Sequence, residues 1–450
     1  MAEPQLSRAP AGGIGAAVAA ANERARNSLL RNHGGGHAEV SNLELFFDLV
    51  FVFAITQLSH FLMGRLNLVG AVQAGIMFAA VWWAWMYTTW ATNWINPDRA
   101  INRLMLGLVM LASLIMSAAI PAAFADSGLA FAASYVAVQV GRSLYVGWTM
   151  EREKRGDGLN QLRISVWFIA TGPLWIYGAL ADRIDLRMTL WAIALAIDYA
   201  GPFLLFRTPW LGRSRPQDWV ISGSHMSERC GLFIIIALGE GLVITGASYA
   251  GAAAQPGLDL ALVNAFAGSF AMWWLYFDMG ARRGARHIQQ HAVPGLIARQ
   301  AFTYWHIPIV AGIVVLAVGD ELVLAHPLEA SHPDFIAIVI GGTMLFIGGL
   351  AGFKRISSGN PWFPASHVYG LFLAIALGAW ALWRHPPHLL LLVWITVLFT
   401  AIAVWEWGSF HGGWMERMEE RDWWIAKVLR RRIERRREQR LAEEARKAKP

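Results

Sequence analysis

Twelve long apolar runs, separated by short polar loops, follow one another between residues 41 and 410. A run of about 20 mostly apolar residues is long enough to cross a bilayer as an α-helix. The pattern therefore predicts an all-α membrane protein with about twelve transmembrane helices. The predicted spans lie near residues 44–64, 68–90, 103–125, 128–149, 161–181, 187–206, 226–247, 258–280, 299–319, 334–353, 363–383 and 388–408.

The composition supports this interpretation. Apolar residues make up 56% of the 450 positions, charged residues make up 15%, and the mean hydropathy is +0.40. Soluble domains carry about 25% charged residues. The chain is therefore predicted to be a multi-pass membrane protein whose main partner is the lipid bilayer.

The lysines and arginines of the predicted loops are distributed unequally between the two sides of the membrane. The loops on the side of the N-terminus carry most of them, and the other side carries Arg65, Arg183, Arg187 and Arg384. Because Lys and Arg accumulate in cytoplasmic loops, both termini are predicted to be cytoplasmic. The expected location is the inner (cytoplasmic) membrane of the cell.

The two ends of the chain differ from the apolar region. Residues 1–40 are rich in Ala, Gly and Arg, and they are predicted to be a flexible cytoplasmic tail without a signal peptide. Residues 414–450 hold 13 of the 38 Lys and Arg residues. Apolar positions recur there at helical spacing, so residues 411–450 are predicted to form a basic amphipathic helix that binds anionic lipids. No nucleic-acid binding is predicted, since a membrane protein's inner flank is expected to be basic.

The chain contains signs of an internal repeat. Ser41-x-x-Glu44 aligns with His225-x-x-Glu228, and Trp-Trp pairs follow at 82–83 and 273–274, each before an Arg-bearing loop. A chance match among apolar segments is the alternative. The pattern predicts a six-helix repeat in residues 41–210 and a second in residues 220–410. An even number of spans per repeat makes the two repeats parallel.

Four motifs carry a resemblance to a known family. They are Glu44-Leu-Phe-Phe-Asp48 through His60, His225-x-x-Glu228-Arg229 through Glu240, Trp273-Trp-Leu-Tyr-Phe-Asp278, and Tyr304-x-His306-x-Pro308. In these motifs the chain resembles the low temperature requirement protein A family of bacterial membrane proteins. The family's name records a growth phenotype and implies no biochemical activity.

A weaker resemblance concerns the start of the first run. Phe47-Asp48 and the apolar residues after it are similar to the first-helix Phe-Ser-Asp motif of the potassium channels of endolysosomes and bacteria, which are built from six-helix repeats. Phe47 stands where that motif has Ser, and the second half lacks the pattern. The resemblance implies a shared architecture and leaves ion conduction open.

Acidic residues near the start of the first run are the first candidates for function, because a charge in hydrocarbon usually faces a bundle interior, a partner or water. Asp48 is predicted to line a cavity or a gate. The alternative is a structural ion pair, for example with Arg103. Glu44 lies one helical turn earlier, and Ser41-x-x-Glu44 fits a capping box, so its expected role is a helix cap.

The seventh run begins with a second charged group. His225 and Arg229 are one helical turn apart and Glu228 adjoins them, which predicts a local, mainly structural charge cluster at the inner surface. Glu240 follows among Ile, Leu and Val. At the rise of an α-helix it lies roughly 18 Å beyond Glu228 along the helix. Its depth favours a functional site over an anchor.

Four further residues complete the candidate set. Arg142 is the predicted intramembrane counter-ion of Asp48, Asp198 or Glu240, with snorkelling as the alternative. Asp278 is predicted to pair with Arg282 at the inner boundary. His60 and His306 are candidates for carrying protons, although simple polar contacts would also account for them.

The sequence lacks the motifs of several enzyme classes. It contains no HExxH, no GxSxG, no Walker loop and no dinucleotide-binding GxGxxG followed by an acid. A bis-histidine haem site would need His60 and His306 to face each other. We therefore expect no enzymatic activity, no cofactor and no metal.

These observations lead to two main hypotheses. In the first, the protein is channel- or transporter-like, and Asp48 and Glu240 line a route for a small cation or proton, with Arg142 or Arg103 setting their charge. In the second, it is a non-transporting sensor or scaffold that responds to the state of the lipid, and its acids form structural ion pairs. An intramembrane enzyme would need a catalytic set that the sequence does not contain. The oligomeric state is left open.

Overall fold

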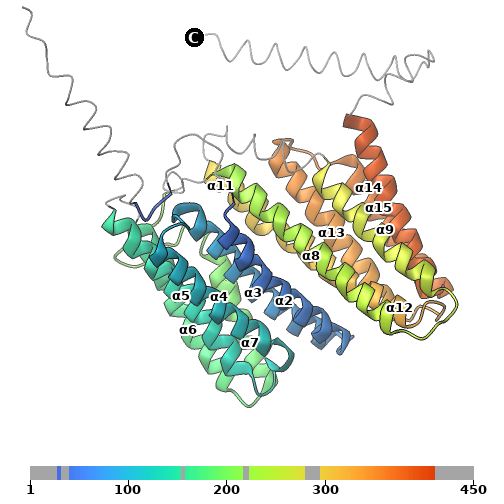
Figure 1. Cartoon of the computed structure of the whole chain (residues 1–450), viewed down its shortest axis with the longest axis horizontal. Helices are drawn as coiled ribbons and strands as arrows, with labels where there is room; N and C mark the ends of the chain where they lie inside the picture. The colour runs from blue at the N-terminus through green and yellow to red at the C-terminus, as the bar shows by residue number, and fades with distance from the viewer. Residues whose placement is uncertain (1–27, 32–39, 154–157, 216–221, 279–293, 411–450) are drawn as a thin grey trace, which may run out of the picture.

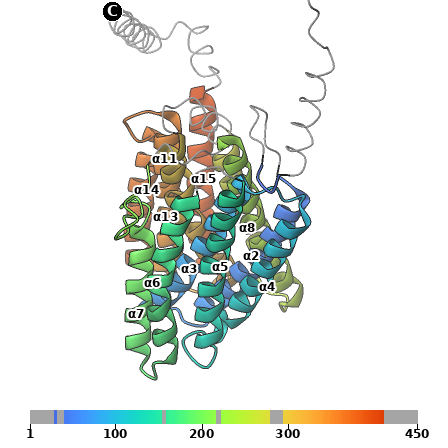
Figure 2. The same cartoon turned by 90° about the vertical axis from the view of Figure 1, so that its left-hand side faces the viewer.

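The computed structural model describes residues 28–31, 40–153, 158–215, 222–278 and 294–410. In these residues the chain forms twelve long helices, and its β-structure is limited to isolated bridges. Figures 1 and 2 show that the helices run side by side along one axis. The first six are α2 (Asn42–Met63), α3 (Leu68–Trp94), α4 (Ala100–Ala119), α5 (Gly128–Arg152), α6 (Gly158–Leu180) and α7 (Ile184–Ala200). The other six are α8 (Gly223–Gly251), α9 (Leu258–Phe277), α12 (His306–Ala325), α13 (Pro333–Ser358), α14 (Ala365–Arg384) and α15 (His388–Phe410).

The prediction of an all-α fold is confirmed, and each predicted span corresponds to one long helix. Among the described residues, ten helical segments are long and apolar enough to cross a membrane. Helices α6 and α7 are not among them, and α7 has only 17 residues. Large apolar side chains are exposed on the outer faces of the bundle, as Leu104, Leu108 and Leu111 are on α4. Their spacing of three and four residues places them in one stripe, as expected of a helix face that contacts lipid.

The helix starts follow from local hydrogen bonding. At the start of α2 the Ser41 hydroxyl accepts a bond from the Glu44 backbone N–H, and the Glu44 carboxylate accepts the Ser41 N–H over 2.9 Å. This is the predicted capping box, and it satisfies two N–H groups that a helix start leaves unpaired. At the start of α8 the Ser222 hydroxyl accepts the His225 N–H in the same way.

The two groups of six helices lie beside each other. In Figure 1 the first half, α2–α7, is blue to green, and the second half, α8–α15, is yellow-green to red. The halves meet where α2 and α3 pack against α8 and α12. Helix α2 begins and α15 ends at the same end of the bundle, here named the terminal end. Because α8 also begins there, α2 and α8 run parallel to each other.

A short N-terminal stretch packs against the terminal end. Leu30 is buried and forms a bridge with Ile95, and the Asn102 amide donates to the Leu29 carbonyl over 2.8 Å. Residues 28–31 were expected to belong to a flexible tail, and they contact the bundle. The remainder of that predicted tail up to residue 39, and the predicted amphipathic helix at 411–450, lie outside the described residues.

Close packing of α12 on α13 depends on glycine. A Cβ added to Gly312 would lie 2.6 Å from the Phe346 nitrogen and 2.8 Å from the Gly342 carbonyl oxygen. Both are backbone atoms, so a side chain at Gly312 would force the two helices apart. Small residues permit this kind of close approach between membrane helices.

We expect Gly312→Ala to lower the free energy of unfolding by about 1–3 kcal/mol, the usual penalty for overpacking. The matched control is Gly341→Ala on α13, where an added Cβ has nothing within 4 Å. That substitution should preserve or slightly raise stability. Thermal unfolding in detergent measures both, and equal melting temperatures would contradict the close helix contact.

Candidate functional site

Asp48 of α2 binds Arg229 of α8 in the interior of the bundle. Arg229 Nη2 donates to Asp48 Oδ1 over 2.7 Å, and both side chains are 0% exposed. The indole Nε1 of Trp85 on α3 donates to the same oxygen over 2.7 Å. The pair therefore joins the first half of the protein to the second at a point where three helices meet.

The Asp48–Arg229 pair is made through one oxygen and one nitrogen. Asp48 Oδ2 and the Nε and Nη1 of Arg229 have no hydrogen-bond partner among the described residues. The guanidinium carbon lies 5.7 Å from the centre of the Phe47 ring and 5.8 Å from that of Trp85. Aromatic faces thus surround the cation, and both partners keep bonding capacity for a further group.

Glu44, one turn nearer the terminal end, makes a second bridge between the halves. Its Oε2 accepts from Arg31 Nη2 over 2.7 Å, and its Oε1 lies 2.8 Å from His225 Nε2. The Asn93 amide nitrogen lies 3.2 Å from His225 Nδ1. Because an amide N–H₂ can only donate, Nδ1 is the acceptor and Nε2 carries the proton that His225 donates to Glu44. Glu44 is therefore a cap, as predicted, and also an interhelical acceptor.

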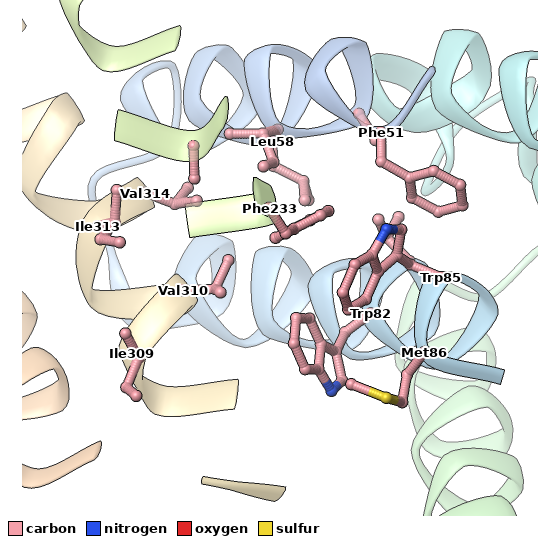
Figure 3. Packing of buried hydrophobic residues seen from close by; sticks show 14 of the residues in the cluster. Phe51, Leu58, Trp82, Trp85, Met86, Phe233, Ile309, Val310, Ile313 and Val314 are labelled. Atoms are coloured by element: carbon pink, nitrogen blue, oxygen red, sulfur yellow. The ribbon is translucent and has the colours of Figure 1, made fainter. Parts of the chain in front are cut away.

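A third contact between α2 and α8 lies deeper. The Thr56 hydroxyl donates to the half-buried carboxylate of Glu240. Phe51 of α2 and Phe233 of α8, whose positions along the two helices fall between the two contacts, form an apolar layer with Trp82 and Trp85 (Figure 3). In that layer the ring centroid of Phe233 lies 4.3 Å from that of Trp85 and 5.7 Å from that of Trp82. Polar groups thus follow one face of α2 at Glu44, Asp48 and Thr56, with an aromatic layer between the second and the third.

The second half reaches α3 through an irregular turn before α12. After α11 (Pro294–Ala298), residues Arg299–Tyr304 form a π-helical turn. Pro308 has no N–H to donate to the Tyr304 carbonyl, which interrupts the regular ladder. Thr303 in this turn accepts two bonds from α3: Trp82 Nε1 donates to its carbonyl over 2.9 Å, and Trp90 Nε1 donates to its hydroxyl over 3.1 Å.

The predicted partners of two arginines are wrong. Arg103 is 59% exposed and bonds Asp98 and the Pro97 carbonyl, so it does not set the charge of Asp48. Arg142 is buried but pairs with no carboxylate among the described residues. It donates to the Ala84 carbonyl, the Thr88 hydroxyl and the Gln139 side chain. The sequence shows how far along its helix a residue lies, but it does not show which neighbouring helix that residue faces. The partners therefore could not be predicted from position along the chain.

Asp198, one of those predicted partners, is linked to Arg142 only indirectly. Its carboxylate accepts from Tyr135 Oη over 2.9 Å and from Thr171 over 2.7 Å. Gln139 Nε2 donates to Tyr135 Oη over 3.1 Å and bonds Arg142 through its oxygen. A chain of two neutral side chains therefore separates the acid from the arginine.

The predicted local cluster of His225, Glu228 and Arg229 is also wrong. His225 and Arg229 reach across to α2, as described above. Glu228 is half-buried, and its Oε2 has no hydrogen-bond partner among the described residues. His225 and Arg229 lie on the face of α8 that packs against α2, and so they pair between helices and not with each other or with Glu228.

The remaining candidates do not join this site. His60 is exposed in the last turn of α2 at the far end, whereas His306 is 0% exposed at the terminal end of α12, so the two do not face each other. Tyr276 Oη lies 2.8 Å from His306 Nε2. Asp278 is exposed after the end of α9, and its predicted partner Arg282 lies outside the described residues.

Two parts of the charged interior are not predicted from the sequence. Arg31 falls in the predicted tail, although the apolar pair Leu29-Leu30 beside it indicates an attached segment. Lys354 falls in a predicted loop, but it is buried in α13 and bonds Glu406 of α15, which also lies 3.3 Å from His367 Nδ1. The signal for this cluster was Glu406 itself, an acid within the last apolar run.

Long apolar helices with charged pairs buried between them define an integral membrane protein whose two halves are connected by buried polar contacts. The chain belongs to the bacterial low temperature requirement A (LtrA) family, whose sequence profile matches residues 39–404. An uncharacterized protein of Rhizobium meliloti (strain 1021) is 36% identical over 377 residues, which cover 84% of this chain and 91% of that relative. No solved structure matches. The family resemblance of the four motifs is thereby confirmed.

A double-mutant cycle measures the Asp48–Arg229 pair. Asp48→Asn or Arg229→Met alone leaves a buried charge without its partner and should cost about 3–5 kcal/mol. The combined variant removes both charges and should recover most of that loss. Unfolding in detergent gives the four free energies.

The matched control is the exposed pair Arg183–Asp185, whose side chains are 76% and 66% exposed. Asp185→Asn should leave the free energy of unfolding essentially unchanged, because exposed ion pairs contribute little to stability. Additive losses at Asp48 and Arg229 would show that the two residues do not act as a pair.

Proposed function

We propose that this protein is a channel- or transporter-like membrane protein of the inner membrane, which moves a small cation or proton along the interface between its two halves. The observation that supports this proposal is the row of polar contacts between α2 and α8. It begins with Glu44–His225 at the terminal end, continues with Asp48–Arg229, and resumes at Thr56–Glu240. Intramembrane acids at a helix interface commonly mark ion or proton pathways.

The described conformation corresponds to a closed state in this proposal. Asp48 is neutralised by Arg229, so an ion would have to separate or displace that pair. The layer of Trp85, Phe233 and Phe51 then blocks the step toward Glu240 (Figure 3). Asp48 Oδ2, which has no partner among the described residues, offers the acceptor atom for an incoming cation or proton.

A common pattern of helix contacts in the two halves supports a pathway between them. In each half, the first helix contacts the second and the third, the third contacts the fourth, the fourth the fifth, the fifth the sixth, and the second the sixth. We propose on this basis that residues 41–210 and 220–410 are two parallel six-helix repeats with a common axis along the membrane normal. With the terminal end cytoplasmic, as the loop charges favour, the route would open from the cytoplasm at Glu44.

Reconstitution in liposomes tests this proposal. Wild-type protein should release a proton, K⁺ or Na⁺ gradient faster than empty vesicles. Glu240→Gln, which keeps shape but removes the charge, should slow the flux roughly tenfold, as expected for the loss of about 1.4 kcal/mol of stabilisation. Asp48→Asn should alter the flux as well, and it is compared only if it elutes as a folded protein.

The matched control is Asp259→Asn. Asp259 lies at the start of α9 at the far end of the bundle, where Tyr249 Oη donates to it over 2.7 Å. The ion flux through the Asp259→Asn variant should equal that of the wild type. No flux above empty vesicles, or equal flux from Glu240→Gln and wild type, would contradict the proposal.

The second candidate function is a sensor or scaffold for the lipid state, and one observation favours it. Glu44 has all its interactions satisfied by Arg31, Ser41 and His225, which suits a structural role. In that case hydrogen exchange of residues 223–235 should depend on the anionic-lipid content of the vesicle. Replacing Arg430, Arg431 and Arg432 by Gln should abolish this dependence, while ion flux should be absent throughout.

A further inference from the structure

A narrow pocket at the terminal end is lined from both halves of the protein. Helices α3, α5 and α6 supply most of its wall, and the π-helical turn of the second half closes it. Its polar side chains are Tyr87, Arg142, Ser143, Gln161, Arg299 and Thr303. Among the described residues that line it there are two arginines and no aspartate or glutamate, so its local charge is positive.

Arg142 is the first reason to expect an anion there. It is only 2% exposed, and its hydrogen bonds go to neutral oxygens of Ala84, Thr88 and Gln139. A guanidinium stays charged in proteins, and a buried charge without a counter-ion is strongly unfavourable. The indirect link to Asp198 passes through two neutral side chains and leaves the cation itself without a direct negative partner among the described residues.

Tyr87 is an independent second reason. Its side chain is buried, with the residue 8% exposed, and its hydroxyl has no hydrogen-bond partner among the described residues. Its ring centre lies 5.3 Å from the Arg142 guanidinium carbon. Arg299, which donates to the Pro202 carbonyl through Nη1, also has an Nε without a hydrogen-bond partner there. Unsatisfied buried donors are unfavourable. The Tyr87 hydroxyl and the Arg299 Nε therefore favour the binding of a hydrogen-bond acceptor.

The size and chemistry of the pocket select the ligand. Its total empty volume is about 430 Å³ including the open mouth, and its inner part has room only for a small body such as a single ion or a water molecule. Trp90, Ala91 and Trp94 form part of the wall, so the ligand must part readily with its hydration shell. A water molecule would satisfy the hydroxyl but would not balance the charge of Arg142.

We propose that this pocket binds one small monovalent anion of the chloride type, held by Arg142, Arg299 and the Tyr87 hydroxyl. Arg142 and Tyr87 belong to the first half and Arg299 to the second, so the bound anion links the two halves. This inference does not depend on the proposed cation or proton route. It predicts that halide stabilises the folded protein, because a ligand that binds the folded form alone raises its stability.

The experiment is thermal unfolding of the full chain in detergent, at constant ionic strength, as gluconate is replaced by chloride or bromide. The melting temperature of the wild type should rise and saturate. Tyr87→Phe and Arg299→Gln should raise the half-saturating halide concentration at least roughly tenfold, since each removes a hydrogen bond to an ion. In gluconate alone, Tyr87→Phe should be no less stable than wild type, because it removes only an unsatisfied hydroxyl.

The matched control is Arg163→Gln. Arg163 lies at the same end of the first half and donates to the Leu211 carbonyl outside the pocket. Arg163→Gln removes the same charge as Arg299→Gln. The rise of its melting temperature with halide concentration should equal that of the wild type. Bromide-soaked crystals should show an anomalous peak between Tyr87 and Arg142. A melting temperature independent of halide, an equal response of all variants, or no peak at saturating bromide would overturn the proposal.

Discussion

The buried ion pair between Asp48 and Arg229 is the constraint on which the arrangement of the two halves depends. Either charge alone would be strongly unfavourable in the interior of a membrane bundle. The pair forms only if the first helices of the two halves lie against each other at the level of Asp48 and Arg229. Trp85 donates to the same oxygen of Asp48 and so ties α3 to the same point. The contacts of Glu44 with His225, and of Thr56 with Glu240, then follow along the same two helices.

Buried charged groups also lie within each half of the protein. Arg142 and Asp198 lie within the first half, in a network of Gln139, Tyr135 and Thr171. In the second half Lys354, Glu406 and His367 form a separate buried cluster. Several of these groups lie toward the terminal end, where a charge is nearer to the aqueous phase. The middle of the interface is occupied by aromatic rings (Figure 3), so any movement of ions there requires a change in helix packing.

The helices could be predicted from the sequence because each apolar run is long and bounded by polar residues. The capping box of Ser41 and Glu44 was also predictable, since it involves residues three apart on one chain. Asp48 and Arg229 could each be identified as unusual, but their pairing could not. They are 181 positions apart, and local spacing instead favoured a pairing of Arg229 with its own neighbours. The partners assigned to Arg103 and Arg142 failed for the same reason.

The sequence by itself therefore determined that this is a membrane protein built of long apolar helices, that Ser41 and Glu44 cap the first of them, and that Asp48 and Arg142 lie in apolar surroundings. These properties depend on hydropathy and on contacts within one or two helical turns. The tertiary structure alone decided that α2 and α8 meet, that Asp48 is neutralised, and that Arg142 and Tyr87 share a pocket with Arg299. Those outcomes depend on which face each helix presents to a distant one. Burial energies determine that choice jointly for the whole bundle, so no single segment encodes it.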